Sequence, residues 1–177
     1  MKRWLSVLIF LVMPAAGQDQ KPGDLPKGPA NVALTVYLVS GLAQPQPAGK
    51  DDVPQDLAET LQQLRGVFTY KSYKLIEDIT LRGRNQGGAE VAGVLPDLSD
   101  YDFRYARARV APDSPRVVHL DGLRLWISRR HANRAADTVA LVSTDLDVRD
   151  GQKTVVGKSA VNATDAIFLV IVARIID

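Results

Sequence analysis

The chain has 177 residues, of which 22 are basic and 20 are acidic, and 46% are hydrophobic. A formal net charge of +2 excludes a polycation, and the length is enough for one domain with an apolar core. The absence of cysteine excludes a disulfide framework and thiol catalysis, so the fold must be held by apolar burial.

The N-terminus predicts export. Lys2 and Arg3 precede an apolar run over residues 4–13, and small residues follow at 15–17. This is the pattern of a secretory signal over residues 1–17, and the run is shorter than the roughly 20 residues that span a bilayer. Once Lys2 and Arg3 are removed, 20 basic residues balance 20 acidic ones. We expect a periplasmic or secreted protein without a membrane span in its mature chain.

The next segment, residues 18–30, contains three prolines and four charged residues and predicts a flexible leader. Residues 31–177 are then predicted to form a single β-rich domain. Its first segment, residues 31–41, is mostly apolar and rich in β-branched side chains. This composition favours a first strand.

One amphipathic helix follows. The spacing of four apolar residues is that of one helical face: Leu57, Leu61, Leu64 and Phe68. Pro54 suits the first turn of this helix, and Gly66 is placed to end it. We expect the helix to lie across one face of a sheet.

A hairpin is predicted after the helix. Residues 70–82 place Tyr73, Leu75, Ile79 and Leu81 on one face of a strand and charged or polar residues on the other. Residues 85–88 read as a turn, and residues 89–95 as the strand that returns beside the first.

Five further strands are expected at residues 101–111, 116–128, 138–148, 153–161 and 166–176, and Asp150-Gly151 predicts a hairpin turn between two of them. Residues 166–173 are apolar on both faces, which is typical of a central strand covered above and below. The predicted class is α+β, a predominantly antiparallel sheet or sandwich of about eight strands with one helix packed on a sheet face.

A phosphate-binding loop is excluded at Gly151–Ser159. That motif has four residues between its glycines, whereas five separate Gly151 from Gly157. The β-branched residues within this stretch favour a strand instead.

Two carboxylates are candidates for catalysis or metal binding. Asp145 and Asp147 share a face of their predicted strand, as acid/base chemistry or a hard cation would require. The alternative is an ordinary solvated strand face. His119 and His131 have no ligand-like spacing to each other or to a carboxylate, and no Gly-x-Ser-x-Gly motif is present. We therefore expect neither a catalytic residue nor a cofactor.

The strongest charge asymmetry lies between residues 104 and 134, where eight arginines face only Asp113 and Asp121. Phe103, Tyr105 and Trp126 are interleaved with them. The pattern predicts a patch for an anionic partner, such as a phosphate-bearing envelope polymer or an acidic protein, rather than nucleic acid. The candidate binding residues are Arg104, Arg107, Arg109, Arg124, Arg129 and Arg130. The alternative is that these arginines only solvate outward strand faces and protect sheet edges.

The C-terminal 34 residues carry a family resemblance. The matching residues are Asp150, Gly151, Gln152, Thr154, Val155, Val156 and Gly157, followed by residues 168–172 and by Arg174, Ile175 and Ile176. They resemble the β-hairpin core of secretins, the outer-membrane channels of secretion systems and type IV pili. Residues 159–165 stand where secretins carry the channel gate, so the resemblance implies hairpin geometry and a place in an envelope assembly rather than a pore.

A second resemblance, over residues 53–75 and 151–158, is to a family of exported bacterial proteins, and it implies no activity. Together these patterns predict a non-catalytic exported binding or assembly module of the bacterial cell envelope, with an envelope or secretion-assembly protein as its partner. The alternatives are a small envelope hydrolase or metal-dependent enzyme that uses Asp145 and Asp147, and an anion-binding domain centred on Arg104 to Arg134.

Overall fold

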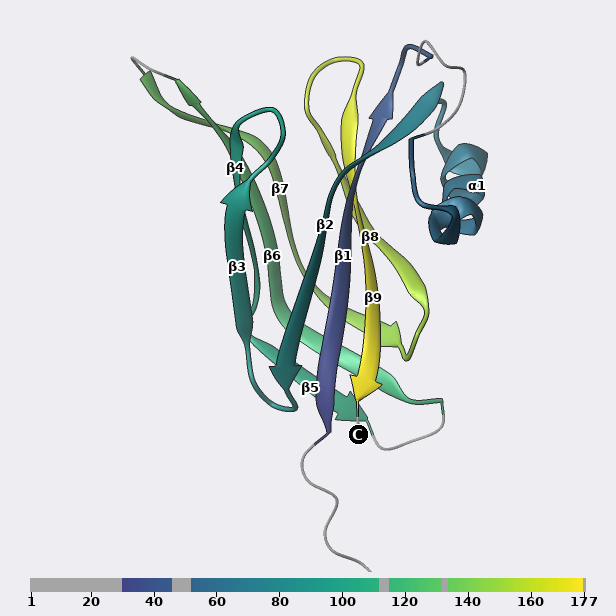
Figure 1. The fold of residues 1–177 in the computed structure, drawn as a ribbon, viewed down its shortest axis with the longest axis vertical. Coiled ribbons are helices and arrows are strands. Elements are labelled where there is room, and N and C mark those ends of the chain that lie inside the picture. The colour runs from purple at the N-terminus through teal and green to yellow at the C-terminus, as the bar shows by residue number, and fades with distance from the viewer. Residues whose placement is uncertain (1–29, 46–51, 112–114, 132–133, 177) are drawn as a thin grey trace, which may run out of the picture.

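The computed structural model describes residues 30–45, 52–111, 115–131 and 134–176, with the side chains of 130–136 outside this description. These residues form two antiparallel sheets that pack face to face (Figure 1). Sheet A has the order β2 (Ser72–Arg84), β1 (Asn31–Leu42), β9 (Ala166–Ile176) and β8 (Lys153–Ala160). Sheet B contains β3 (Ala89–Val94), β4 (Ser99–Tyr105), β5 (Arg107–Ala111), β6 (Val117–His131) and β7 (Arg134–Arg149). The predicted fold class is confirmed.

The main core lies between the two sheets. Alternate residues of each strand point inward, as a period of two requires. Strands β1 and β9 contribute Val32, Leu34, Val36, Leu38, Ile167, Leu169, Ile171 and Ala173, and sheet B contributes residues that include Phe103, Tyr105, Leu120, Leu123, Leu125 and Ile127. All of these side chains are buried.

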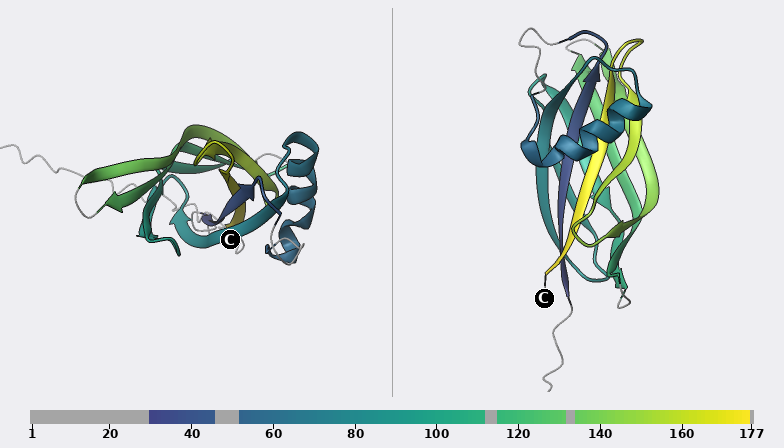
Figure 2. Two further views of the ribbon diagram at one scale, coloured as in Figure 1. Left: turned by 90° about the horizontal axis from the view of Figure 1, so that it is seen from above. Right: turned by 90° about the vertical axis from the view of Figure 1, so that its right-hand side faces the viewer.

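The predicted helix covers the outer face of sheet A. A 3₁₀ turn over Gln55–Leu57 leads into α1 (Ala58–Val67), which crosses the face formed by β1 and β9 (Figure 2). Leu57, Leu61 and Leu64 are buried there in a second core with side chains that include Val39, Tyr73, Phe168 and Val170. One part of the prediction is wrong, because the helix runs through Gly66 and ends where Phe68 becomes extended.

Strand β9 has both faces buried, as predicted. It pairs with β1 on one side and β8 on the other. All eight residues from Ala166 to Ala173 are buried. Even-numbered Phe168 and Val170 lie under the helix, while odd-numbered Leu169 and Ile171 lie between the sheets.

Strand β2 departs from the simple alternation predicted for it. The register with β1 shifts at Ile76, which has no partner opposite it. Tyr73 and Leu75 therefore lie under the helix, whereas Ile79 and Leu81 point between the sheets. A single extra residue moves the following side chains to the other face, so one strand serves both cores.

Two predicted hairpins are in fact connections between sheets. The turn after β2 leads to β3, which belongs to sheet B and pairs with β4. Asp150-Gly151 likewise leads from β7 of sheet B to β8 of sheet A, and Gly151 there has a φ of +75°. The hairpin in the C-terminal segment instead turns at residues 161–165, between β8 and β9. Local turn signals identified the corners but not the strands that pair.

The structure has one more strand than predicted because residues 101–111 are divided at Ala106. Strands β4 and β5 pair with the same edge of β6, in the same register, on either side of this residue. Gly122 lies at the same level of β6 and has a φ of +62°, and an added Cβ there would lie 3.0 Å from the Ala106 Cβ. Each strand thus carries one extra residue at this level, and β6 also bulges relative to β7.

The predicted signal at residues 1–17 lies outside the described residues, as does the predicted leader at 18–30 apart from Ala30. Across the part of the chain that the structure describes, no helix combines the length and apolar character needed to cross a membrane.

Candidate functional site

The arginine-rich segment forms β5, β6 and the end of β4 in sheet B, and the pleat divides its side chains between two faces. Phe103, Tyr105 and Leu125 are buried between the sheets. Arg104 and Arg124 alternate with them and are exposed on the opposite side, which we call the outer face of sheet B. The sequence pattern predicts that aromatic residues interleave with the arginines on one surface. This is wrong for residues 103 and 105, because their side chains are buried between the sheets and the arginines lie on the outer face.

Arg104 and Arg124 are directly opposite each other. They are register partners in the β4–β6 pairing, which places their Cβ atoms about 4.5–5.5 Å apart. Neither guanidinium makes a hydrogen bond or ion pair to any residue that the structure describes. We call these two residues the arginine pair. Like charges placed opposite each other repel, and Glu90, the register partner of Arg104 on β3, offsets part of the charge of the pair.

The arginine pair borders two hollows on the outer face of sheet B. The larger, of about 610 Å³, is also lined by Glu90 and Ser143. The smaller, of about 330 Å³, is lined by the pair together with Asp102 and Trp126. Glu90 is the register partner of Arg104 on β3, and Asp102 is the register partner of Trp126. Both hollows are open to solvent along this face of the sheet.

The other candidate arginines differ in their surroundings. Arg109 forms an ion pair with Asp121 at 3.1 Å, and Arg129 forms one with Asp97 at 3.4 Å. Arg107 is exposed on β5, opposite Asp121 in the β5–β6 pairing. The side chain of Arg130 lies outside the described residues. Of the six predicted residues, Arg104 and Arg124 thus lie together. Arg109 and Arg129 each form an ion pair with an aspartate elsewhere.

Asp97 orders the loop before β4. Its carboxylate accepts hydrogen bonds from the Ser99 backbone N–H at 3.0 Å and the Ser99 hydroxyl at 3.1 Å, beside the Arg129 guanidinium. Partial burial opposes ionisation, but these hydrogen bonds and the charge of Arg129 outweigh it and hold the pKa of Asp97 below its usual 3.8.

A pH-dependent stability difference follows for Asp97→Asn. Because the folded-state pKa is lowered, ionised Asp97 stabilises the fold above its unfolded-state pKa, and this is lost as the pH falls through the folded value. We expect Asp97→Asn to lower the unfolding free energy at neutral pH by less than about 1 kcal/mol, since the pair is exposed. Urea unfolding at descending pH should show the difference shrinking below about pH 4. A difference independent of pH would contradict this account.

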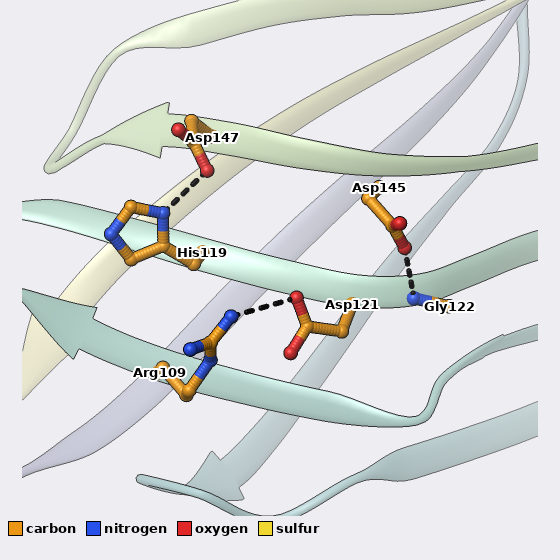
Figure 3. A network of polar contacts seen from close by, with 6 residues as sticks. All are labelled: Arg109, His119, Asp121, Gly122, Asp145 and Asp147. Carbon is orange, nitrogen blue, oxygen red and sulfur yellow. Dashed lines mark hydrogen bonds and ion pairs between the residues drawn. The ribbon is translucent and has the colours of Figure 1, made fainter.

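The two predicted carboxylates lie on the outer face of sheet B but have separate partners (Figure 3). Asp147 contacts the Nδ1 atom of His119 at 2.5 Å, across the β6–β7 pairing. Asp145 accepts a hydrogen bond from the backbone N–H of Gly122 at 2.6 Å. Among the described residues, no group of three or more acidic, histidine or cysteine side chains is placed to hold a metal ion.

These contacts give both carboxylates a structural role. Asp145 satisfies a backbone N–H that the bulge at Gly122 removes from the sheet pairing, and Asp147 forms a cross-strand pair with His119. A glycine within an otherwise regular strand pattern is the sequence signal that could have predicted the bulge. His131, the other predicted candidate, has its side chain outside the described part of the chain.

Trp126 is a functional candidate that is not among the binding residues predicted from sequence. Its side chain is 43% exposed on the outer face of sheet B. Leu141 is its register partner on β7 and is 47% exposed. The Nε1 atom of Trp126 donates a hydrogen bond to the Thr138 hydroxyl at 3.1 Å, which orients the ring.

Comparison of the sequence with models of known protein families and with curated proteins finds no match.

Proposed function

We propose that this protein is a non-catalytic, exported binding module of the bacterial cell envelope, and that it binds an anionic envelope component on the outer face of sheet B. The predicted signal over residues 1–17 and the resemblance of residues 150–176 to secretins support export and a place in an envelope assembly. The observation that carries the binding role is the arginine pair. The two guanidinium groups lie opposite each other on adjacent strands and form no ion pair with any residue that the structure describes, so both can contact one anion.

The chemistry of the pair suits an oxyanion. Each guanidinium offers several N–H donors in a fixed fork that matches a carboxylate or phosphate group. An anion between Arg104 and Arg124 would satisfy donors from both strands and remove their mutual repulsion. Arg107 is exposed on the same face, toward its β5 end, and adds to the positive field.

Salt-dependent retention on phosphocellulose tests this proposal. We expect the double variant Arg104→Gln/Arg124→Gln to elute at clearly lower salt than the unaltered protein, because exposed charge contacts are screened by salt. A matched control is Arg82→Gln/Arg174→Gln. Arg82 and Arg174 are both exposed and both pair with Ala33 on the outer face of sheet A. This control removes the same net charge from the opposite side of the sandwich.

The comparison of the two double variants decides the result. Retention lost only in the Arg104/Arg124 variant supports a localised anion site. Equal loss in both variants would show that retention follows net charge, and it would overturn the proposal for the outer face of sheet B.

A further inference from the structure

The surface beside the arginine pair combines three kinds of chemistry. Two guanidinium groups, an exposed indole and a carboxylate meet in the smaller hollow, through Arg104, Arg124, Trp126 and Asp102. The larger hollow adds the Glu90 carboxylate and the Ser143 hydroxyl. A ligand for this surface must therefore satisfy positive groups, hydrogen-bond acceptors and an apolar ring together.

The aromatic component is held in place. The hydrogen bond from Trp126 to Thr138 spans β6 and β7 and restricts the indole. Trp126 and its register partner Leu141 are both exposed, so they form a small apolar surface beside the arginine pair. Because the orientation of the indole is already fixed, little side-chain entropy is lost when a ligand stacks on it.

The carboxylates favour a ligand that has hydroxyl groups as well as negative charge. Asp102 and Glu90 offset part of the attraction that the arginine pair exerts on a chain that carries only phosphate groups. Both carboxylates can instead accept hydrogen bonds from hydroxyl groups, since an ionised carboxylate is an acceptor only. The required ligand has a negative charge, several hydroxyl groups and an apolar face within one small ring.

We propose, building on the anion-binding function above, that the ligand is an acidic polysaccharide containing carboxylate-bearing sugars. The sugar carboxylate lies between Arg104 and Arg124, its hydroxyl groups donate to Asp102 and Glu90, and its apolar C–H face stacks on Trp126. Because the arginine pair borders both hollows, successive sugars of one chain can occupy the two sites.

Titration of the protein with a tetramer of galacturonic acid tests the proposal. Its fully methyl-esterified form, which lacks the charge, and a short linear polyphosphate serve as comparison ligands. The sequence contains two tryptophans, Trp4 and Trp126. In protein lacking residues 1–17, indole fluorescence therefore reports on Trp126 alone, and calorimetry supplies an independent affinity.

We expect the charged tetramer to bind and to change the Trp126 emission. Trp126→Ala and Arg104→Gln/Arg124→Gln should each weaken its binding by about tenfold or more, since truncation of an aromatic or arginine anchor has effects of this size. The control Arg82→Gln/Arg174→Gln should bind as the unaltered protein does. The altered side chains are exposed, so matching thermal melts would show that each variant is folded.

The outcomes separate this inference from the function on which it rests. Equal binding of the methyl-esterified tetramer would overturn the role of the sugar carboxylate. Polyphosphate binding that needs the arginine pair but not Trp126, without binding of the charged tetramer, would overturn the polysaccharide and leave the anion-binding function in place. Failure of every anionic ligand to bind would overturn both.

Discussion

Truncation after Asp165 is expected to abolish cooperative folding. The deletion removes β9, which lies between β1 and β8 and is buried from Ala166 to Ala173. Six of these eight residues are larger than alanine, and burying each contributes about 1.5–3 kcal/mol, or on the order of 9–18 kcal/mol together. A domain of this kind is stable by only about 5–15 kcal/mol. The remaining strands should therefore show no cooperative thermal transition by circular dichroism.

Single substitutions in β9 provide graded controls for the truncation. Phe168 packs against Phe68, Tyr70 and Tyr73 beneath the helix, with ring centroids 5.1–6.0 Å apart. Phe168→Ala should cost about 3–5 kcal/mol of unfolding free energy. Arg174 lies in the same strand but is exposed, so Arg174→Gln should change the unfolding free energy by no more than about 0.5 kcal/mol. A truncated protein that kept a cooperative melt would show that β9 is not central to the core.

The elements that could be predicted from sequence are those whose burial depends on local pattern. An apolar run such as residues 166–173 has nothing polar to present on either face, so it must be covered on both sides whichever strands are its partners. The leucine spacing of α1 likewise requires an apolar surface beneath one face of the helix. In both cases the structure contains the expected apolar neighbours, because the helix and β9 pack against each other in the second core.

Strand pairing could not be predicted from the same patterns. Asp150-Gly151 has the turn chemistry of a hairpin, yet it leads from one sheet to the other. A tight turn reverses the chain in both situations, and the choice depends on which distant strands complete each sheet. The bulge at Ile76 could not be predicted for a related reason. The alternation of apolar and polar residues continues in the sequence even where the register with β1 shifts.

The candidate site shows the same division between local and distant information. The sequence predicted an arginine-rich region, but it could not distinguish Arg109, which has Asp121 as its partner, from Arg104 and Arg124. The latter two meet only because β4 pairs with β6 in a particular register. Asp145 and Asp147 share a face as predicted, and their partners likewise come from another strand.

Gly83→Ala is the second substitution for which we expect a large effect, and it should be rescued by a change on the opposite sheet. Gly83 lies on β2 of sheet A, and Tyr105 lies on β4 of sheet B with its ring in the core between them. A Cβ at Gly83 would overlap the Tyr105 hydroxyl oxygen, whereas the ring carbon Cζ is 3.5 Å away, an ordinary contact. The missing side chain thus provides the space for the hydroxyl.

The hydroxyl makes no hydrogen bond to the described residues that would be lost. The Tyr105 hydroxyl is buried without a hydrogen-bond partner among the described residues, and burial raises the pKa of Tyr105 above its usual 10.0. Tyr105→Phe alone should therefore leave the unfolding free energy unchanged or raise it by about 1 kcal/mol, because an unsatisfied buried polar group is removed. Gly83→Ala alone should lower the unfolding free energy by about 1–3 kcal/mol through overpacking.

The double variant Gly83→Ala/Tyr105→Phe is the decisive measurement. Removing the hydroxyl leaves Cζ as the nearest atom of residue 105, so the added methyl group fits and most of the lost stability should return. Chemical unfolding of the four proteins gives the interaction free energy, which should favour the double variant by about 1 kcal/mol or more. Purely additive effects would mean that strain in the β2 backbone, rather than contact between the two sheets, makes glycine necessary at position 83.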